Sequence, residues 1–289
     1  MIDHPEKTRP AAGGEAQEGA AAAAPPAGPE TIDARAAAPA LPKAWRDASL
    51  WVSLAAVVLL AGGPIVTGSA SERENLFLIL MAVALCSSLN LVLGYTGYVN
   101  FAHIAFFGLG GYIGFYLLAQ QGWSLYTALL GAGLAIAVLA GALGSVILRL
   151  RGSYFALATI GINEAVRALV ANVDLFGGAT GLSLDFRRYA DYGGPGHALW
   201  VAYYLLAGVA LLGVLLSYAV KNSKFGLGLM AIREDEDAAL VLGIAAPAMK
   251  TIVFVLSAVL PAMVGTLFFF KNGNVEPGDA FRLNMSIEG

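Results

Sequence analysis

The sequence predicts an all-α fold, a polytopic transmembrane helical bundle with about seven spans and a cytoplasmic N-terminus. Two observations support this prediction. First, 58% of the 289 residues are hydrophobic and 13% are charged, whereas about 25% of the residues of a soluble domain are charged. So few charged residues cannot cover the surface of a compact soluble domain of this length. Second, the apolar residues gather in long windows, and a helix needs about 20 such residues to cross a membrane.

The composition also argues against several classes of function. The net charge of −3 makes a nucleic-acid partner unexpected. The single cysteine, Cys86, excludes an intrachain disulfide framework and a multi-cysteine metal site. The three histidines are far apart in the sequence, and no glycine-rich phosphate loop ends in Gly-Lys-Ser/Thr. We therefore expect no enzyme activity, no cofactor and no metal site.

Residues 1–42 differ from the rest of the chain. Fourteen of them are alanine and seven are proline, so this segment has too few large apolar side chains to offset the entropy of ordering it. We predict a disordered cytoplasmic tail at 1–42 and a transmembrane domain at 43–289. The first apolar run starts near Ala48, not at the extreme N-terminus where a secretory signal would lie.

Seven apolar windows follow the tail, and each is a predicted membrane span. Tryptophans near the ends of three windows, at positions 51, 123 and 200, suit the membrane–water interface. The predicted spans are 50–66, 76–93, 104–119, 125–148, 154–173, 198–220 and 251–270.

Lysine and arginine residues near the window ends predict the orientation of the spans. Cytoplasmic segments of membrane proteins carry an excess of these residues. With the N-terminus inside, eight of them flank cytoplasmic ends and five flank outer ends. The loop 221–250 is then cytoplasmic, and the loop 174–197 is the longest outer loop.

The cytoplasmic loop contains a predicted short helix. Four acids at 234–237 precede a small apolar run that stops at Gly243. Acidic residues stabilise the first turn of a helix, and glycine readily adopts the left-handed conformation that ends one. An exposed helix of this kind can dock into a groove on a partner, and a solvated connecting loop is the equally weighted alternative.

A break at 93–114 interrupts the apolar sequence with glycines and polar residues. Non-helical backbone at membrane depth occurs inside protein or beside a water-filled cavity, and broken helices often form transporter substrate sites. We therefore predict that Asn100 and His103 lie on a translocation pathway. Gly114, four residues after Gly110, is instead predicted to let two helices pack closely.

Glu164 and Arg167 are charged residues within a predicted span. Because they are three residues apart, they share a helix face and can pair. A charge at bilayer depth is a functional candidate, so both residues are candidates for the translocation pathway. A structural ion pair that locks this helix to a neighbour is the favoured alternative.

Four stretches of the chain together resemble one family. They lie at 88–112, at 148–170 with the turn 177–182, at 223–244 and at 257–268. In order and spacing they are similar to the permease subunits of bacterial branched-chain amino acid ABC transporters, the LivM type. This resemblance implies a multi-pass protein of the bacterial inner membrane that translocates branched-chain or similar apolar amino acids.

The resemblance also implies partners and a coupling element. The partners would be two cytoplasmic ABC ATPase subunits, a second related permease subunit, a periplasmic substrate-binding protein and the lipid bilayer. Residues 231–243 would form a coupling helix seated in a groove of an ATPase, with aspartate in place of the family's usual glutamate at position 237. The implied coupling residues are Arg233, Glu234, Asp237, Ala238, Ala239 and Gly243.

Other functions stay open. Permeases for urea or short amides are related to this family, and the sequence does not separate the two substrates. An ion-coupled secondary transporter that uses Glu164 is a second alternative, and an intramembrane enzyme is the weakest. Family members usually continue past 285–288 into a further span, so the resemblance implies a fragment or a shortened product. The tail at 1–42 has no counterpart in the family.

Overall fold

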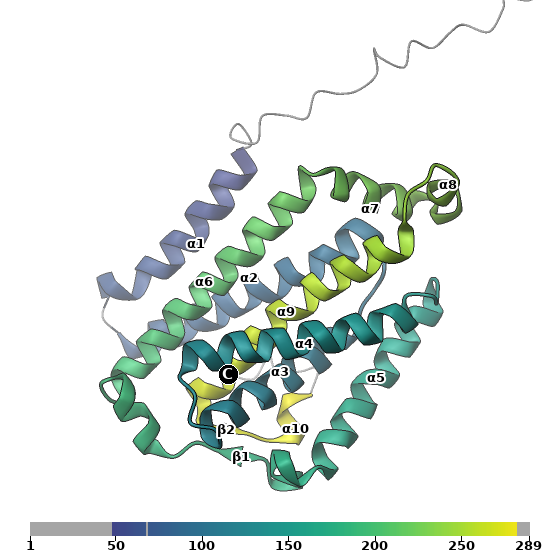
Figure 1. Ribbon diagram of the computed structural model, residues 1–289. Coiled ribbons are helices and arrows are strands. Elements are labelled where there is room, and N and C mark those ends of the chain that lie inside the picture. The colour runs from purple at the N-terminus through teal and green to yellow at the C-terminus, as the bar shows by residue number, and fades with distance from the viewer. Residues whose placement is uncertain (1–47, 68, 282–289) are drawn as a thin grey trace, which may run out of the picture. The chain divides into compact units, whose positions relative to one another are not determined.

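The computed structural model describes residues 48–67 and 69–281, which form a bundle of long helices with a two-stranded β-ribbon at one end (Figure 1). The predicted tail at 1–42 lies outside the described residues. Within the described part of the chain, six helices are long and apolar enough to cross a membrane. They are α2 (Ala70–Thr96), α3 (Ala102–Ala119), α4 (Leu125–Ile147), α5 (Ser153–Asn172), α6 (Pro195–Lys221) and α9 (Ala246–Asn272).

The polytopic helical fold is therefore confirmed, with one difference at its beginning. The first predicted span is helical, as α1 (Ala48–Thr67), but its apolar part, Ala48–Pro64, is shorter than the other spans. The other predicted windows each correspond to one long helix. Their boundaries differ where a polar cap starts the helix outside the apolar window: Ser69 Oγ accepts a hydrogen bond from Glu72 N (3.2 Å), so α2 begins six residues before the predicted span.

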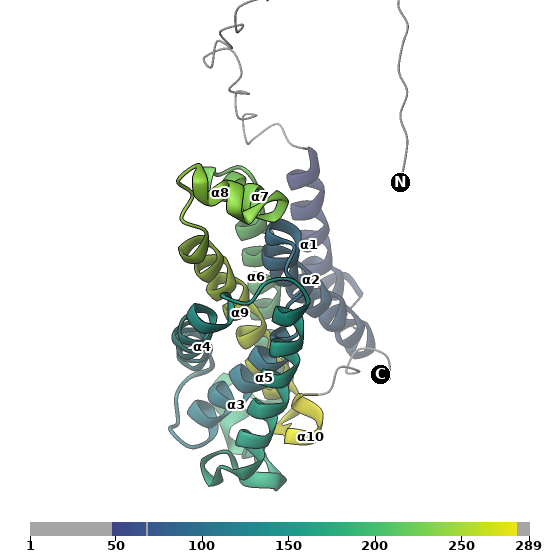
Figure 2. The ribbon, with the colours of Figure 1, turned by 90° about the vertical axis from the view of Figure 1, so that its right-hand side faces the viewer.

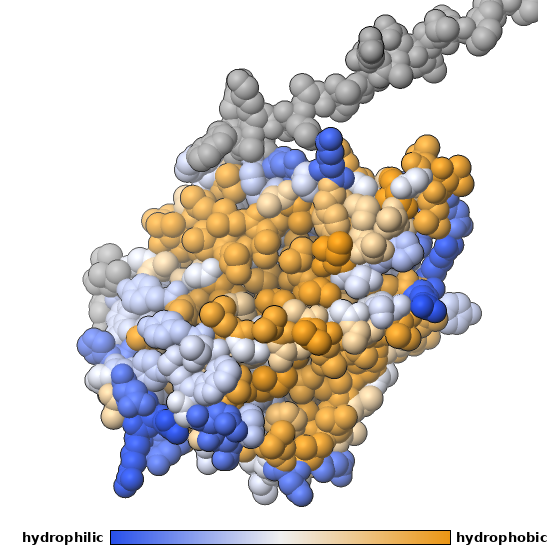
Figure 3. Space-filling view, in the orientation of Figure 1, coloured by the Kyte–Doolittle hydropathy of each residue, from blue (hydrophilic) through white to orange (hydrophobic). Residues whose placement is uncertain are grey.

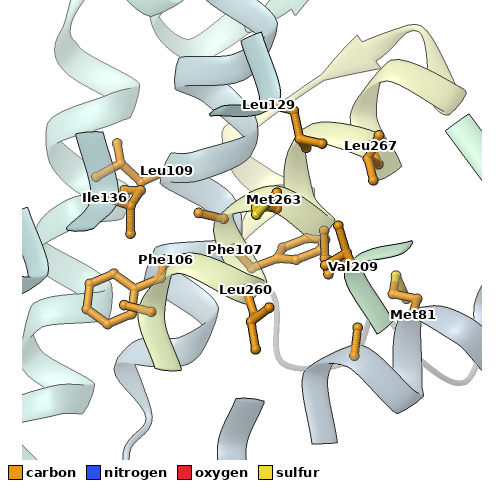
Figure 4. Close-up of a cluster of buried hydrophobic side chains, with 14 of the residues drawn as sticks. Met81, Phe106, Phe107, Leu109, Leu129, Ile136, Val209, Leu260, Met263 and Leu267 are labelled. Atoms are coloured by element: carbon orange, nitrogen blue, oxygen red, sulfur yellow. The ribbon is translucent and has the colours of Figure 1, made fainter. Parts of the chain in front are cut away.

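The core of the bundle surrounds α9. This helix packs against α3, α4 and α2, and α3 and α9 are the most deeply buried of the six spans. Figure 4 shows three α9 side chains, Leu260, Met263 and Leu267, among side chains from the neighbouring helices. The neighbours labelled there are Met81 of α2, Phe106, Phe107 and Leu109 of α3, Leu129 and Ile136 of α4, and Val209 of α6.

Small residues let α3 and α9 approach closely. A Cβ atom added at Gly114 would lie 2.3 Å from Thr266 Oγ1, so the packing role predicted for Gly114 is confirmed. A Cβ atom added at Gly265 would lie 2.1 Å from the carbonyl oxygen of Phe107. Thr266 Oγ1 also donates a hydrogen bond to Gly110 O (3.1 Å) across the two helices.

The two ends of the bundle have different elements (Figure 2). One end has α7 (Lys224–Glu234) and α8 (Glu236–Val241), which follow α6. The other end has three 3-10 turns (Asp174–Phe176, Gly178–Thr180 and Phe186–Tyr192), the antiparallel strands β1 (Leu182–Ser183) and β2 (Asn274–Val275), and α10 (Pro277–Ala280). The predicted cytoplasmic and outer loops thus lie at opposite ends, and which end faces the cytoplasm stays a prediction.

Candidate coupling and translocation sites

The predicted single helix at 231–243 is wrong in one respect, because the structure has two helices there. The chain becomes extended at Asp235 (φ −155°, ψ 110°), where α7 ends and α8 begins. Asp235 Oδ1 accepts hydrogen bonds from the backbone N–H groups of Asp237 (2.9 Å) and Ala238 (3.0 Å). Aspartate is a strong N-cap residue, so one of the four consecutive acids starts a new helix instead of continuing the first.

The most exposed large apolar side chains of this loop lie at the C-terminal tip of α8, and Leu227 and Met230 of α7 are exposed to a lesser degree. Val241 is 88% exposed, Leu242 is 79% exposed, and Leu240 beside them is also exposed. We call these three residues the docking tip, and Figure 3 shows hydrophobic residues where Figure 1 places α8. Gly243, with φ +85°, turns the chain after the tip as predicted. Among the predicted coupling residues, Ala238 is exposed like the tip, whereas Ala239 is buried against the bundle.

Asp237 ties α8 to the connection between α4 and α5. Its two carboxylate oxygens accept hydrogen bonds from Arg151, at 3.0 Å and 3.1 Å. The Arg151 hydrogen bond lowers the pKa of Asp237 below its usual value. Both side chains are more than half exposed, and exposed pairs contribute little to stability. This contact therefore orients α8 without fixing it strongly.

Glu236 is held much more firmly than Asp237. Its Oε1 atom lies 2.7 Å from Nζ of Lys250, whose side chain is 2% exposed. Lys250 Nζ also donates to Leu148 O (3.1 Å) and lies 5.1 Å from the centre of the Tyr98 ring. The second carboxylate oxygen of Glu236 accepts a hydrogen bond from the Tyr98 hydroxyl (3.0 Å). Burial and the nearby Glu236 raise the pKa of Tyr98 to about 12, so the hydroxyl keeps its proton.

The sequence reasoning did not identify this cluster of Glu236, Lys250 and Tyr98 as a site. The three residues come from α8, α9 and the connection before α3, and only the tertiary fold brings them together. The feature of the sequence that could have indicated this cluster is Lys250, a lysine at the start of a strongly apolar span. Glu236 and Arg151 both line two cavities, of about 700 Å³ and about 400 Å³.

Arg233 points toward the bundle. Its Nη1 atom donates a hydrogen bond to Gly94 O (2.8 Å) in the last turn of α2. Gly97, which ends α2 in the left-handed conformation (φ +73°), has the Arg233 side chain directly beside it. Arg233 therefore fixes the end of α2 relative to α7. Glu234, the last residue of α7, is exposed.

Asn100 and His103 belong to a buried chain of hydrogen bonds. Asn100 Oδ1 accepts from Ala102 N (3.0 Å), and Asn100 Nδ2 lies 3.0 Å from His103 Nδ1. His103 Nε2 lies 3.0 Å from Ser88 Oγ, which donates to Ser257 O (2.5 Å). The chain connects α2, α3 and α9 with the segment between α2 and α3. A role for Asn100 and His103 in a translocation pathway stays a prediction.

The directions of these hydrogen bonds define the state of His103. Because Asn100 Oδ1 accepts a hydrogen bond from the backbone, its Nδ2 amide group must donate to His103 Nδ1. Because the Ser88 hydroxyl donates to Ser257 O, His103 Nε2 must supply the proton between His103 and Ser88. The arrangement therefore fits a neutral imidazole with its proton on Nε2, and both ring nitrogens are used inside the bundle.

Replacing Ser88 with alanine should test how much this chain contributes to stability. The change leaves His103 Nε2 and Ser257 O without their partner in a buried place, so we expect a loss of about 1–3 kcal/mol of unfolding free energy. Thermal unfolding of the detergent-solubilised protein measures this loss. Ser145→Ala is the matched control, because Ser145 is exposed and its hydroxyl contacts a carbonyl of its own helix. Equal unfolding temperatures for the two variants would contradict the prediction.

Glu164 and Arg167 do pair, with 3.3 Å between Oε2 and Nη1. Both side chains are more than half exposed, so within the described residues the pair does not lock α5 to another helix, as the favoured interpretation required. The buried side of α5 faces α3 and includes Asn163, whose Oδ1 atom has no hydrogen-bond partner among the described residues. A pathway role for Glu164 and Arg167 stays a prediction.

The described residues 48–67 and 69–281 contain no group of three or more histidine, cysteine, aspartate or glutamate side chains placed to hold a metal ion. The polar side chains described above instead join α7 and α8 to the ends of the membrane spans. These contacts hold α7 and α8 against the ends of α2 and α9 and against the connection between α4 and α5.

Comparison with known proteins then identifies the family. The family model described as the permease component of the branched-chain amino acid transport system matches residues 73–288. The chain belongs to this permease family. With six long apolar helices in the described part of its chain, this permease is a multi-pass protein of the bacterial inner membrane.

Two curated relatives show how far the similarity of this permease extends. The high-affinity branched-chain amino acid transport system permease protein LivM of Escherichia coli strain K12 is 33% identical over 227 residues, which are 69% of this chain and 52% of that protein. The LivM protein of Salmonella typhimurium strain LT2 is 32% identical over 226 residues, 68% of this chain and 52% of that protein. The chain spans about half the length of these relatives. No solved structure is significantly similar to it.

Proposed function

We propose that this permease forms the membrane channel of an ABC importer for branched-chain amino acids and that separate ATPase subunits drive it by docking on α7 and α8. It has no catalytic activity of its own in this proposal. The observation that supports it most directly is the docking tip, whose residues Val241 and Leu242 are the most exposed large apolar side chains of the described loop 221–250 at the end of the bundle. Exposed apolar residues of this kind favour a protein partner.

The partners follow from the same proposal. Two cytoplasmic ATPase subunits bind the docking tips of this permease and of a second, related permease subunit, and a periplasmic binding protein delivers the substrate to the opposite end. The end with α7 and α8 is then cytoplasmic. Because α1 begins at that end of the bundle (Figures 1 and 2), the N-terminus is cytoplasmic as well.

Uptake by the purified complex in liposomes tests the function. We expect uptake of radiolabelled leucine that requires ATP, the ATPase subunits and the binding protein. Unlabelled isoleucine and valine should compete, and urea should not. Uptake that an ion gradient drives without ATPase subunits would contradict the proposal and favour a secondary transporter. Competition by urea alone would overturn the proposed substrate.

Replacing Val241 with glutamate should weaken the docking. The new carboxylate would have to enter an apolar groove without a partner, and a loss of about 1.4 kcal/mol or more corresponds to at least a tenfold loss of affinity. Co-purification of the ATPase subunits with the tagged permease measures this affinity. Val241→Ile, which keeps an apolar side chain at the tip, is the matched control. Retention of the ATPases by Val241→Glu at the level of Val241→Ile would show that the tip is not the docking surface.

A further inference from the structure

We infer that Glu236 and Tyr98 are positioning residues that transmit movement of α8 to the segment 97–101, the non-helical connection that leads into α3. The inference rests on the proposed function, because it concerns how force from the ATPases reaches the membrane spans. It assigns the transmission to a buried contact, separate from the docking tip that would bind the ATPase.

The segment 97–101 is held by side chains of other elements. Thr159 Oγ1 of α5 accepts a hydrogen bond from Phe101 N (3.2 Å), and the Phe155 ring of α5 packs edge-on against the Tyr98 ring, with 5.1 Å between ring centres. Gly97 N donates the last hydrogen bond of α2, to Leu93 O (3.1 Å), and residues 98–100 belong to neither a helix nor a strand. The position of this segment therefore depends on the elements around it.

Glu236 is the α8 residue that reaches this segment. Both of its carboxylate oxygens are occupied, one by Lys250 and the other by the Tyr98 hydroxyl, and its side chain is 14% exposed. The Tyr98 hydroxyl thus donates to a charged, largely buried carboxylate, and a hydrogen bond to a charged group is stronger than one between neutral groups. Movement of α8 should therefore displace Tyr98, whereas the exposed contact between Asp237 and Arg151 can rearrange in water.

The contact continues into the bundle. Tyr98 and Asn100 belong to the same short segment, and Asn100 begins the hydrogen-bonded chain through His103 and Ser88 to Ser257 of α9. A displacement at Glu236 can thus shift α3 relative to α2 and α9 through directly contacting groups. Chains of packed and hydrogen-bonded groups of this kind carry energetic coupling between distant sites, and the experiments below measure the coupling through this one.

Replacing Tyr98 with phenylalanine tests the transmission. The change removes the hydroxyl that contacts Glu236 and retains the ring that contacts Phe155 and Lys250. We expect the number of leucine molecules imported per ATP hydrolysed to fall about tenfold. A tenfold change corresponds to about 1.4 kcal/mol, which is near the lower end of the range for a hydrogen bond to a charged group. Basal ATP hydrolysis and assembly of the complex should not change. Tyr126→Phe is the matched control, because Tyr126 is exposed at the start of α4.

A double-mutant cycle tests whether Tyr98 and Glu236 act through one contact. Glu236→Gln should reduce the transport per ATP at least as much as Tyr98→Phe. If the two residues act together, the double variant should be no worse than Glu236→Gln alone. Multiplied losses in the double variant would overturn the inference. If Tyr98→Phe lowers the yield of the complex, the labelling measurement below still tests the inference, because it reports only on the complex that assembles.

Thiol labelling gives a readout that a merely structural role would not change. Val99, which is 43% exposed, is replaced by cysteine in the complete permease after Cys86 is replaced by serine. The rate of labelling at position 99 should change when ATP binds the wild-type complex. In Tyr98→Phe this change should disappear although ATP still binds. An unchanged response in Tyr98→Phe would overturn the inference.

The outcomes for the inference and for the proposed function are distinguishable. Wild-type uptake that requires ATP, together with unimpaired coupling in Tyr98→Phe, would overturn the inference and leave the function standing. A wild-type complex without ATP-dependent uptake would overturn both.

Discussion

Replacing Gly265 with leucine is expected to destabilise the folded protein strongly. A Cβ atom at this position would lie 2.1 Å from Phe107 O and 3.2 Å from Gly111 N, both in the backbone of α3. Backbone atoms cannot move aside by changing a rotamer, so α3 and α9 would have to separate. Overpacking of a core usually costs about 1–3 kcal/mol and sometimes more. We expect the upper end or beyond here, because this helix pair forms the centre of the bundle.

Gly208→Leu is the matched control for this prediction. Gly208 lies within α6, and nothing lies within 4 Å of a Cβ atom added there. Size-exclusion chromatography of detergent-extracted fluorescent fusions measures the folded fraction of both variants, and thermal unfolding measures their stability. Gly208→Leu should behave like the wild type. If Gly265→Leu elutes and unfolds like the control, the close approach of α3 and α9 is wrong.

The sequence was sufficient to predict the spans because each depends on local composition. A window of apolar residues must be buried in lipid or protein wherever the rest of the chain lies. The boundaries were less accurate, since capping by Ser69 extends α2 beyond its apolar window. The packing role of Gly114 was predictable for a similar reason, because a glycine at helical spacing from another allows close approach whichever helix faces it.

The contacts of the candidate site could not be predicted in the same way. Ser88 and Ser257 are 169 residues apart in sequence, and Tyr98 and Glu236 are 138 residues apart. Nothing in their local sequence indicates which distant residue each will meet. The pairing of Glu164 with Arg167 was predicted from their spacing alone, and they do pair. The exposure of this pair was not predicted, because it depends on how few contacts α5 makes with its neighbours.

The region of α7 and α8 shows both kinds of result. The turn at Gly243 follows from its own conformational freedom and was predicted. The four acids at 234–237 were predicted to lie in one helical turn, but their side chains make different contacts. Asp235 caps a helix, Glu236 pairs with a buried lysine, and Asp237 pairs with an exposed arginine. Consecutive helical residues point in different directions, so their surroundings differ although their residue type does not.

Replacing Glu236 with leucine is expected to destabilise the protein by about 3–5 kcal/mol. The change leaves the ammonium group of Lys250, which is 2% exposed, without its carboxylate, and removing one partner of a buried ion pair costs this amount. Lys250→Met should cost less, because Glu236 keeps hydrogen bonding from Tyr98 and lies 3.7 Å from Arg151. Thermal unfolding in detergent compares these variants with the wild type.

The double variant Glu236→Leu/Lys250→Met separates stability from coupling. An apolar pair of similar size often replaces a buried ion pair with little loss of stability, so the double variant should unfold nearer the wild-type temperature than Glu236→Leu does. Additive losses would show that the two side chains do not stabilise each other. The double variant still lacks the carboxylate that accepts the Tyr98 hydrogen bond. Its stability should therefore recover while its transport per ATP stays low, which a purely stabilising role for Glu236 would not produce.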